Sequence, residues 1–392
     1  MLFHDTLKRA QVMGLGEMWS YNNPVKILFG NDRFESIAPL IDGRPYALVT
    51  YPDAPFQVLI EKVTKEAGKP LIVVNDIAPN PDFKLLSEQS ARFASLRTGP
   101  EVIVALGGGS VIDSAKVFAA AGGDFNRVQR HLEAGCGEPT LATIPVIAVP
   151  TTAGTGSEVT SFATVWDEER GRKFSLAHES LYPEVAVVDP KLMLGKPYGL
   201  TLATGLDALS HSVESIWNVN ANPVSARHAV AAAKAILADL ANLLSDLGNL
   251  ELRSRIAEAS LDAGLAFSNT KTAIAHNLSY PITLGWGVQH GIACSFTLPT
   301  ILRSVAGVGG FRETALKQVF GEDLGRGADD LTNFLKSLGV GHRFADHGVP
   351  DDACTKIIDE AFTGERGKNF IGSRESFLKA ATETGAMKLS PK

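Results

Sequence analysis

Short apolar runs recur along the first half of the chain, and amphipathic stretches with helical spacing separate them. Strands buried on both faces appear as continuous apolar runs, whereas strands with one solvent face alternate apolar and polar residues. The runs here are continuous, so the pattern predicts a parallel β-sheet with helices on both faces. The five runs cover residues 45–51, 71–76, 102–108, 146–152 and 184–190.

The pattern changes after Pro190, where long blocks of helix-forming residues replace the apolar runs. The clearest blocks are residues 223–249 and 251–269, and no later segment has the pattern of a strand. A change of this kind, punctuated by Pro and Gly, is typical of a domain boundary. We therefore expect an α/β domain over residues 1–195 and an all-helical domain over residues 196–392.

Composition narrows the class of protein. A chain of 392 residues with 45% hydrophobic and 20% charged residues is typical of a globular protein of two or three domains. The net charge is −6 and the basic residues are scattered, so we expect no nucleic-acid partner. No apolar segment reaches the roughly 18 residues that span a bilayer, so we expect no membrane partner. Cys136, Cys294 and Cys354 are too few for a disulfide framework, which favours a cytoplasmic protein.

The first chemical motif is a glycine-rich turn. The apolar residues 102–106 lead into Gly107, Gly108, Gly109 and Ser110, and a helical stretch follows. Glycines let backbone amides approach a phosphate closely, and the helix N-terminus favours an anion. The alternative is a tight turn that needs glycine only for its backbone dihedral angles. We favour a site for a phosphate-bearing cofactor.

A second turn follows the run 146–152 and is rich in hydroxyl groups, with three threonines and a serine between Pro150 and Glu158. Thr155 and Glu158 have capping-box spacing, so a capped helix start is the alternative explanation. Hydroxyls at the carboxyl end of a parallel strand suit a nucleotide ligand. The usual Gly-x-Gly-x-x-Gly fingerprint is absent from the first strand-to-helix turn, so an ordinary Rossmann domain is not predicted.

Carboxylate and imidazole groups gather in the second half of the chain. Asp207 and His211 are four residues apart in a predicted helix, which places them on one face. His276 and His290 add two imidazoles on apolar segments. One carboxylate and three imidazoles suit a divalent metal such as Fe(II) or Zn(II), although a single Asp/His pair is more often an ordinary contact.

Five motifs together resemble the iron-containing (group III) alcohol dehydrogenase family over residues 22–305. They are GGGSVIDSAK, PTTAGTGSEVT, PEVAVVDP, TGLDALSH and AHNLSYP with VQHG, in this order. The resemblance implies an N-terminal dinucleotide-binding α/β domain and a C-terminal helical domain, with the metal between them. It also implies an enzyme that transfers hydride between a nicotinamide cofactor and a small aldehyde or alcohol.

The resemblance assigns site residues position by position. The metal ligands fall on Asp207, His211, His276 and His290, and they would hold Fe(II) or Zn(II). The cofactor contacts fall on Gly107, Gly108, Gly109, Ser110, Asp113, Thr151, Thr152, Thr155 and Lys173.

Catalysis in the family implies a metal that acts as a Lewis acid on the substrate oxygen. Several members carry a further histidine four residues after the third ligand, where this chain has Tyr280. We expect the Tyr280 hydroxyl to relay a proton in its place, or the ring simply to pack. NAD-specific enzymes usually place an acid after the second strand, where this chain has Tyr51 and then Asp53, so NAD(H) and NADP(H) both stay open. The oligomeric state is also open, a homodimer being one option.

The substrate is expected from residues 269–281, which resemble a branch that reduces phosphonoacetaldehyde to 2-hydroxyethylphosphonate. A dianionic substrate needs cations near the metal, and Lys271 is the nearest candidate along the chain. The tail contributes Arg366, Lys368 and Asn369, although most surface cations are simply solvated.

Three alternatives stay open. The same machinery acts on simple alcohols, diols or maleylacetate in other members of the family. A sugar-phosphate cyclase related to dehydroquinate synthase shares the fold, but would normally use one Glu and two His as metal ligands. An inactive nucleotide-binding homologue is the alternative from another class, and the complete set of metal ligands argues against it.

Overall fold

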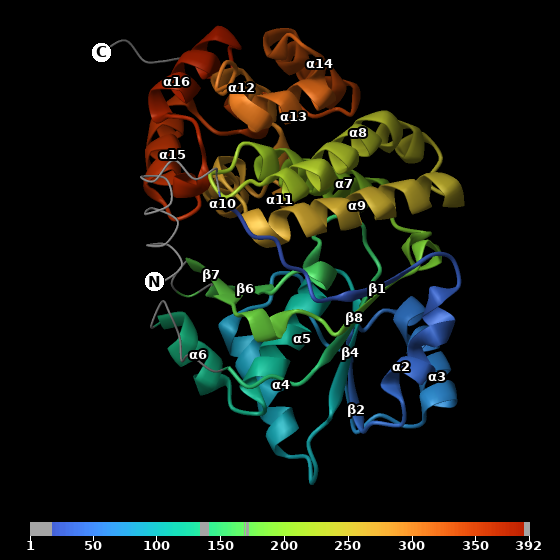
Figure 1. Ribbon diagram of the computed structural model, residues 1–392. Helices are drawn as coiled ribbons and strands as arrows, with labels where there is room; N and C mark the ends of the chain where they lie inside the picture. The colour runs from blue at the N-terminus through green and yellow to red at the C-terminus, as the bar shows by residue number, and fades with distance from the viewer. Residues whose placement is uncertain (1–17, 134–140, 168, 170–171, 388–392) are drawn as a thin grey trace.

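The computed structural model describes residues 18–133, 141–167, 169 and 172–387 (Figure 1). Cys136 lies outside the described residues.

A six-stranded parallel sheet forms the centre of the N-terminal half. Its order is β1-β8-β5-β4-β2-β3, and every pair of neighbours is parallel. The predicted parallel α/β class is therefore confirmed, and all five predicted runs are strands. The strands are β1 (Lys26–Phe29), β2 (Tyr46–Thr50), β3 (Ile72–Val74), β4 (Val102–Gly107), β5 (Val146–Pro150) and β8 (Val185–Val188).

Three further strands were not predicted. β1 has only four residues and forms a sheet edge against β8. β6 (Phe162–Asp167) and β7 (Arg172–Ala177) form a separate antiparallel hairpin. All three lack the continuous buried run on which the prediction relied, because an edge strand and a two-stranded ribbon leave many of their residues partly exposed.

Helices cover both faces of the sheet (Figure 1). α2 (Ile37–Ile41) and α3 (Ala54–Ala67) pack on one face, and α4 (Phe83–Ala94), α5 (Gly109–Ala121) and α6 (Phe125–Glu133) pack on the other. The helix after β2 and the helix after β4 thus leave on opposite faces, although these strands are neighbours. The carboxyl ends of such a strand pair border a crevice, which is where open α/β sheets bind ligands.

The second half is helical, and within the described residues it contains no strand beyond an isolated bridge between Asn218 and Phe370. Its first three helices pack together, and the shorter ones complete the core. The helices are α7 (Tyr198–Ile216), α8 (Pro223–Ser245), α9 (Leu250–Thr270), α10 (Ile274–Trp286), α11 (His290–Ser295), α12 (Leu298–Ser304), α13 (Gly310–Phe320), α14 (Leu324–Ser337), α15 (Asp351–Thr363) and α16 (Arg374–Glu383).

α8 shows how the local sequence sets a helix in this domain. The Asn222 side chain accepts hydrogen bonds from the first-turn amides, Ser225 completes a capping box, and Pro223 is the first helical residue. Within the described residues, α8 is the one helix long and apolar enough by length and composition to cross a membrane, which corrects the expectation that no segment is. One face of α8 is buried against α7 and α9, in the manner of a core helix.

A small apolar cluster joins the two halves. Val188 and Met193 from the end of the α/β region pack with Ala257 and Leu261 of α9. The sheet and the helices otherwise have separate cores. The junction places the carboxyl ends of the strands against the first helices of the second half, as Figure 1 shows.

Candidate metal centre and nucleotide loops

Three helices bring the predicted metal ligands together. α7 carries Asp207 and His211 one turn apart, α10 carries His276 in its first turn, and α11 begins at His290. The Asp207 Oδ1 atom lies 3.4 Å from His276 Nε2, and 3.9 Å from both His211 Nε2 and His290 Nε2. The predicted constellation is therefore present in space, although its segments lie up to 83 positions apart in the chain, from 207 to 290.

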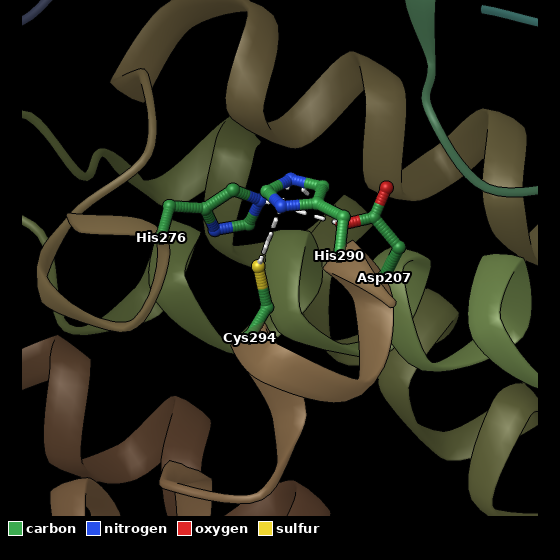
Figure 2. Close-up of side chains that lie close together, drawn as sticks. All are labelled: Asp207, His276, His290 and Cys294. Atoms are coloured by element: carbon green, nitrogen blue, oxygen red, sulfur yellow. Dashed lines mark hydrogen bonds and ion pairs between the residues drawn. The ribbon is translucent and has the colours of Figure 1, made fainter. Parts of the chain in front are cut away.

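The donor atoms of Asp207, His276, His290 and Cys294 all lie within 4.8 Å of one another, and their side chains converge in Figure 2. Asp207 Oδ1 and His276 Nε2 are buried and have no hydrogen-bond partner within the described residues. Buried polar atoms are almost always satisfied, so two unpartnered atoms that face the same point fit a metal-binding role. A carboxylate with several imidazoles fits Fe(II) or Zn(II).

His211 lies beside this group but not within it. Its Nδ1 atom faces the Gly154 carbonyl oxygen at 3.2 Å, and this contact leaves Nε2 to face Asp207. The ring is stacked between Phe267, at 4.1 Å between centroids, and His276, at 4.5 Å. His211 is thus oriented as a ligand would be, and its ligation stays a prediction.

Glu214 is a functional candidate that the sequence analysis missed. It lies on α7, is fully buried, and its Oε2 atom is 2.6 Å from His276 Nδ1. Its oxygens also accept hydrogen bonds from the Ala273 and Ala275 amides at the start of α10. A carboxylate behind a ligating histidine fixes the ring and its tautomer. Nothing in the local sequence reveals this role, because the contact is between two helices.

The pKa values of Asp207, His211 and His290 favour metal binding. Burial lowers the pKa of His211 to about 4, and burial with the nearby Lys173 lowers that of His290 to about 3, so both imidazoles are neutral at pH 7. Burial alone would raise the pKa of Asp207, but His211, His276 and His290 hold it well below its usual range. A carboxylate and neutral imidazoles are the forms that ligate a metal. His276 differs: burial alone would lower its pKa, but Cys294, Glu214 and Asp207 raise it well above the usual value, so this ring must lose a proton when a metal binds.

The glycine turn connects β4 to α5. α5 begins at Gly109, and no side chain caps its first turn, which leaves amide groups available to an anion. Neither Gly107, Gly108 nor Gly109 has a positive φ, so the alternative of glycine for dihedral angles alone is wrong. A Cβ atom on Gly109 would instead lie 2.6 Å from Thr155, so glycine is needed for close approach.

The second turn packs on the first and reaches the metal centre. A Cβ atom on Gly108 would lie 3.1 Å from Thr152 Oγ1, so Thr152 and Thr155 both contact the glycine turn. Gly154, between them, faces His211. The alternative explanation, a capped helix start, is wrong, because Gly156 has a φ of 58° and only a short 3-10 helix without a side-chain cap follows it. We call residues 151–156 the bridging loop.

Three other predicted cofactor contacts, Thr151, Ser110 and Asp113, form hydrogen bonds within the α/β domain. The buried Thr151 amide donates to the Gly107 carbonyl, and the Ser110 side chain hydrogen-bonds Tyr51. Asp113 is committed inside the α/β domain, because its carboxylate accepts from Ser157 Oγ at 2.6 Å and from the Thr164 amide at 2.8 Å. Asp113 therefore supports the loops, and its contact with the cofactor stays a prediction.

A buried lysine holds the same region together. Lys116 on α5 is fully buried, and its Nζ atom donates to the carbonyl oxygens of Ser157, Thr160 and Phe162 at 2.7–2.8 Å. Burial lowers the pKa of this lysine to about 8. These bonds tie the helix that follows the glycine turn to the segment that follows the bridging loop.

Two cations lie beside the metal centre, around Tyr280. The Lys173 Nζ atom, from β7, is 4.1 Å from the centroid of the Tyr280 ring, and the Arg366 guanidinium, from the loop after α15, is 4.9 Å from it. The Tyr280 ring lies parallel to His290 at 5.9 Å. Burial and the proximity of Arg366 lower the pKa of Lys173 to about 7, and burial lowers that of Arg366 to about 10.

The remaining predicted residues do not join this group. Lys271 and Lys368 both have exposed side chains. Contrary to the expectation, the structure therefore does not bring either cation to the metal centre. The Asn369 side chain donates to the Thr272 carbonyl oxygen at 2.9 Å. Asn369 therefore ties the segment that carries Arg366 to the chain just before α10.

Comparison with known proteins gives two matches to family models. A model described as iron-containing alcohol dehydrogenase matches residues 24–190, and one described as Fe-containing alcohol dehydrogenase family, C-terminal, matches residues 201–375. Together these matches cover most of the chain.

Individual relatives cover much of the chain as well. The NAD-dependent methanol dehydrogenase of Bacillus methanolicus is 32% identical over 315 residues, which cover 77% of this chain and 81% of the relative. The phosphonoacetaldehyde reductase of Streptomyces viridochromogenes is 38% identical over 240 residues, or 60% of each chain. The crystal structure of sulfoacetaldehyde reductase from Bifidobacterium kashiwanohense in complex with NAD+ is similar with a TM-score of 0.83 and 27% identity, and the match covers 95% of this chain and 100% of that one.

Proposed function

Because the chain belongs to the iron-containing alcohol dehydrogenase family, we propose that it reduces phosphonoacetaldehyde to 2-hydroxyethylphosphonate with NADH or NADPH. The chain is an NAD-linked alcohol dehydrogenase or aldehyde reductase with a metal site. The phosphonate substrate and the roles of the individual residues are proposals.

One observation carries the choice of substrate, namely the pair of cations around Tyr280. Within the described part of the chain, neither Lys173 nor Arg366 forms an ion pair with a carboxylate. Both residues are half-buried, and charges partly removed from water without a partner are costly, so a pair of them beside a reaction centre favours an anionic ligand. Phosphonate oxygens can accept charge-assisted hydrogen bonds from both side chains. The aldehyde carbon would then lie toward the metal centre, on the other side of Tyr280.

Two relatives support an anionic aldehyde. The phosphonoacetaldehyde reductase acts on the proposed substrate, and the sulfoacetaldehyde reductase acts on a two-carbon aldehyde with a sulfonate in place of the phosphonate. The methanol dehydrogenase, which is similar over more of the chain, acts on a neutral alcohol. The cations beside Tyr280 favour the first two over the third.

In the proposed mechanism, Asp207, His211, His276 and His290 would hold the metal. When bound, the metal polarises the aldehyde oxygen as a Lewis acid, and the nicotinamide cofactor supplies the hydride. Glu214 keeps His276 in the tautomer that presents Nε2 to the site.

Tyr280 is the proposed proton relay for the product oxygen. Its hydroxyl is buried and has no hydrogen-bond partner among the described residues. Lys173 and Arg366 lie over its ring, which places the hydroxyl beside the proposed substrate cations.

Steady-state kinetics test the substrate. We expect kcat/KM for phosphonoacetaldehyde to exceed that for propionaldehyde at least about tenfold, since hydrogen bonds to charged groups contribute about 1.5–3 kcal/mol each. An equal kcat/KM for the two aldehydes, with both NADH and NADPH, would contradict the proposal.

A matched pair of variants tests whether the Arg366 side chain binds the phosphonate group. Arg366→Gln should lower kcat/KM for phosphonoacetaldehyde about tenfold or more, and leave that for propionaldehyde nearly unchanged. Lys368→Gln, which removes an exposed cation two residues away, should change neither. Equal losses with both aldehydes in Arg366→Gln would indicate a structural role for Arg366.

A further inference from the structure

We infer that Cys294 is a further metal ligand, which binds the ion through its sulfur beside Asp207 and the histidines. The inference concerns the metal centre and does not depend on the phosphonate substrate. It adds a soft donor to a site otherwise made of carboxylate and imidazole groups.

The position of Cys294 follows from helix geometry. His290 and Cys294 are four residues apart on α11, so their side chains share one face. The Cys294 Sγ atom lies 3.7 Å from His290 Nε2 and 3.8 Å from His290 Nδ1. Figure 2 shows the sulfur directed toward the imidazole nitrogens.

The separations suit a single ion. Zinc–nitrogen and zinc–sulfur bonds measure about 2.0–2.3 Å, so two ligand atoms on one ion are at most about 4.6 Å apart. The donor atoms of Asp207, His276, His290 and Cys294 already lie within 4.8 Å of one another. This spread is close to the limit, so only small side-chain movements are needed for Cys294 to bind the same ion as the other three.

Two unpartnered buried atoms face the same space as the Cys294 sulfur. Asp207 Oδ1 and His276 Nε2 are buried without partners and face the space that the sulfur also faces. A buried cysteine usually acts as a small apolar side chain. Cys354 on α15 fits that description, since it packs in the apolar core and its sulfur donates to the Pro350 carbonyl oxygen just before the helix. Cys294 differs, because its polar neighbours are the metal-binding groups themselves.

A sulfur ligand changes which metal the centre prefers. The thiol would lose its proton to solvent when it binds, as metal-binding cysteines do. Thiolates favour softer ions, so Cys294 would shift the preference toward Zn(II) or Co(II) and away from Fe(II). A centre with only Asp207 and the histidines would bind these metals mainly according to availability.

Cobalt substitution tests the inference without measuring activity. The chelator-stripped full-length protein is loaded with one equivalent of Co(II), and we expect an intense near-ultraviolet thiolate-to-cobalt charge-transfer band. Cys294→Ser should bind Co(II) without this band. Cys354→Ser, which removes the other described free cysteine, should keep it. A band that persists in Cys294→Ser, or that is missing from the cobalt-loaded wild type, would overturn the inference.

X-ray absorption keeps the inference testable if Cys294→Ser does not fold. The zinc-loaded wild type should show a sulfur neighbour at about 2.3 Å from the metal. A shell of nitrogen and oxygen atoms alone would rule out Cys294 as a ligand. Loss of activity with phosphonoacetaldehyde would leave both spectroscopic results unchanged, so this inference and the proposed substrate can fail separately.

Discussion

At the scale of single residues, Glu214 is a buried carboxylate that its neighbours keep ionised and that orients a predicted metal ligand. Burial would raise the pKa of this carboxyl, but His276 and the amides of Ala273 and Ala275 hold it below its usual value. Glu214 is therefore a carboxylate at neutral pH, and it can fix the His276 ring through Nδ1. The ring therefore keeps Nε2 directed toward the metal site whether or not a metal is bound.

Replacement of Glu214 by Gln should weaken metal binding. We expect the affinity of the metal to fall about 10- to 100-fold, as is typical when a partner behind a ligand is lost. Metal content after dialysis against a weak chelator would measure the loss. Glu313→Gln, at a helix start in the helical domain, is the matched control and should retain the metal. Full metal retention in Glu214→Gln would mean that Glu214 only stabilises the start of α10.

Titration of Lys173 should make kcat/KM for phosphonoacetaldehyde fall as the pH rises. Burial and Arg366 lower its pKa to about 7, so the ammonium is present below that pH and is lost as the pH rises. The phosphonate stays negatively charged throughout this range, because a rise in pH only removes its remaining proton, as it does for a phosphate ester with a second pKa near 6. We expect kcat/KM for phosphonoacetaldehyde to fall above pH 7, because kcat/KM reports groups of the free enzyme.

The control for this pH dependence is a neutral aldehyde. Propionaldehyde should lack the alkaline fall, and Lys173→Arg should move it to higher pH because a guanidinium stays charged. An identical alkaline fall with both aldehydes would assign the titrating group to another step.

Residue types and spacing predicted which side chains lie together at the metal centre, but not the residues around them. Asp207 and His211 are recognisable because a four-residue spacing on a helix is itself a signal. Glu214 looks like any helical glutamate, because its partner lies on α10. Lys271 was expected near the metal from its position in the chain, yet it follows α9 with its side chain exposed. Nearness along the chain does not set the direction of a side chain.

At the scale of elements, the glycine turn depends on contacts with the bridging loop. Gly109→Ala would place a Cβ atom 2.6 Å from Thr155, so one of the two segments must move. We expect the Kd for NADH to rise at least about tenfold, since backbone amides at this turn would no longer reach the cofactor phosphates. Titration of NADH fluorescence would measure it.

Gly99→Ala is the matched control for this substitution. Gly99 has no positive φ and nothing within 4 Å of the position that its Cβ atom would take. The control should bind NADH as the wild type does. Unchanged NADH binding in Gly109→Ala would show that the cofactor does not use this turn.

Strands buried in the sheet were predictable from the sequence, whereas β1 and the β6–β7 hairpin were not. A continuous apolar run occurs where both faces of a strand are covered, as in β4, whose residues are all buried. The hairpin is a two-stranded ribbon beside the sheet, and it presents Lys173 to the helical half. Its role depends on contacts made across the molecule, which no local pattern contains.

At the scale of the whole molecule, the bridging loop has contacts on two sides. Thr152 and Thr155 pack on the glycine turn, and a Cβ atom on Gly156 would lie 2.6 Å from the Gly264 backbone of α9. The sequence predicted an α/β half and a helical half, but not this close approach of two glycines. The approach requires two segments more than 100 positions apart in the chain to have no side chain at the same point.

Because the Gly154 carbonyl orients His211 from within this loop, the metal and the cofactor should be thermodynamically linked. An ion that holds His211 also restrains Gly154, and hence the threonines on either side of it. We expect the metal-loaded protein to bind NADH about 5- to 150-fold more tightly than the stripped protein, and NADH to tighten metal binding by the same factor. Calorimetric titrations in both orders would measure the two factors, and an absence of coupling would mean that the loop responds to each ligand independently.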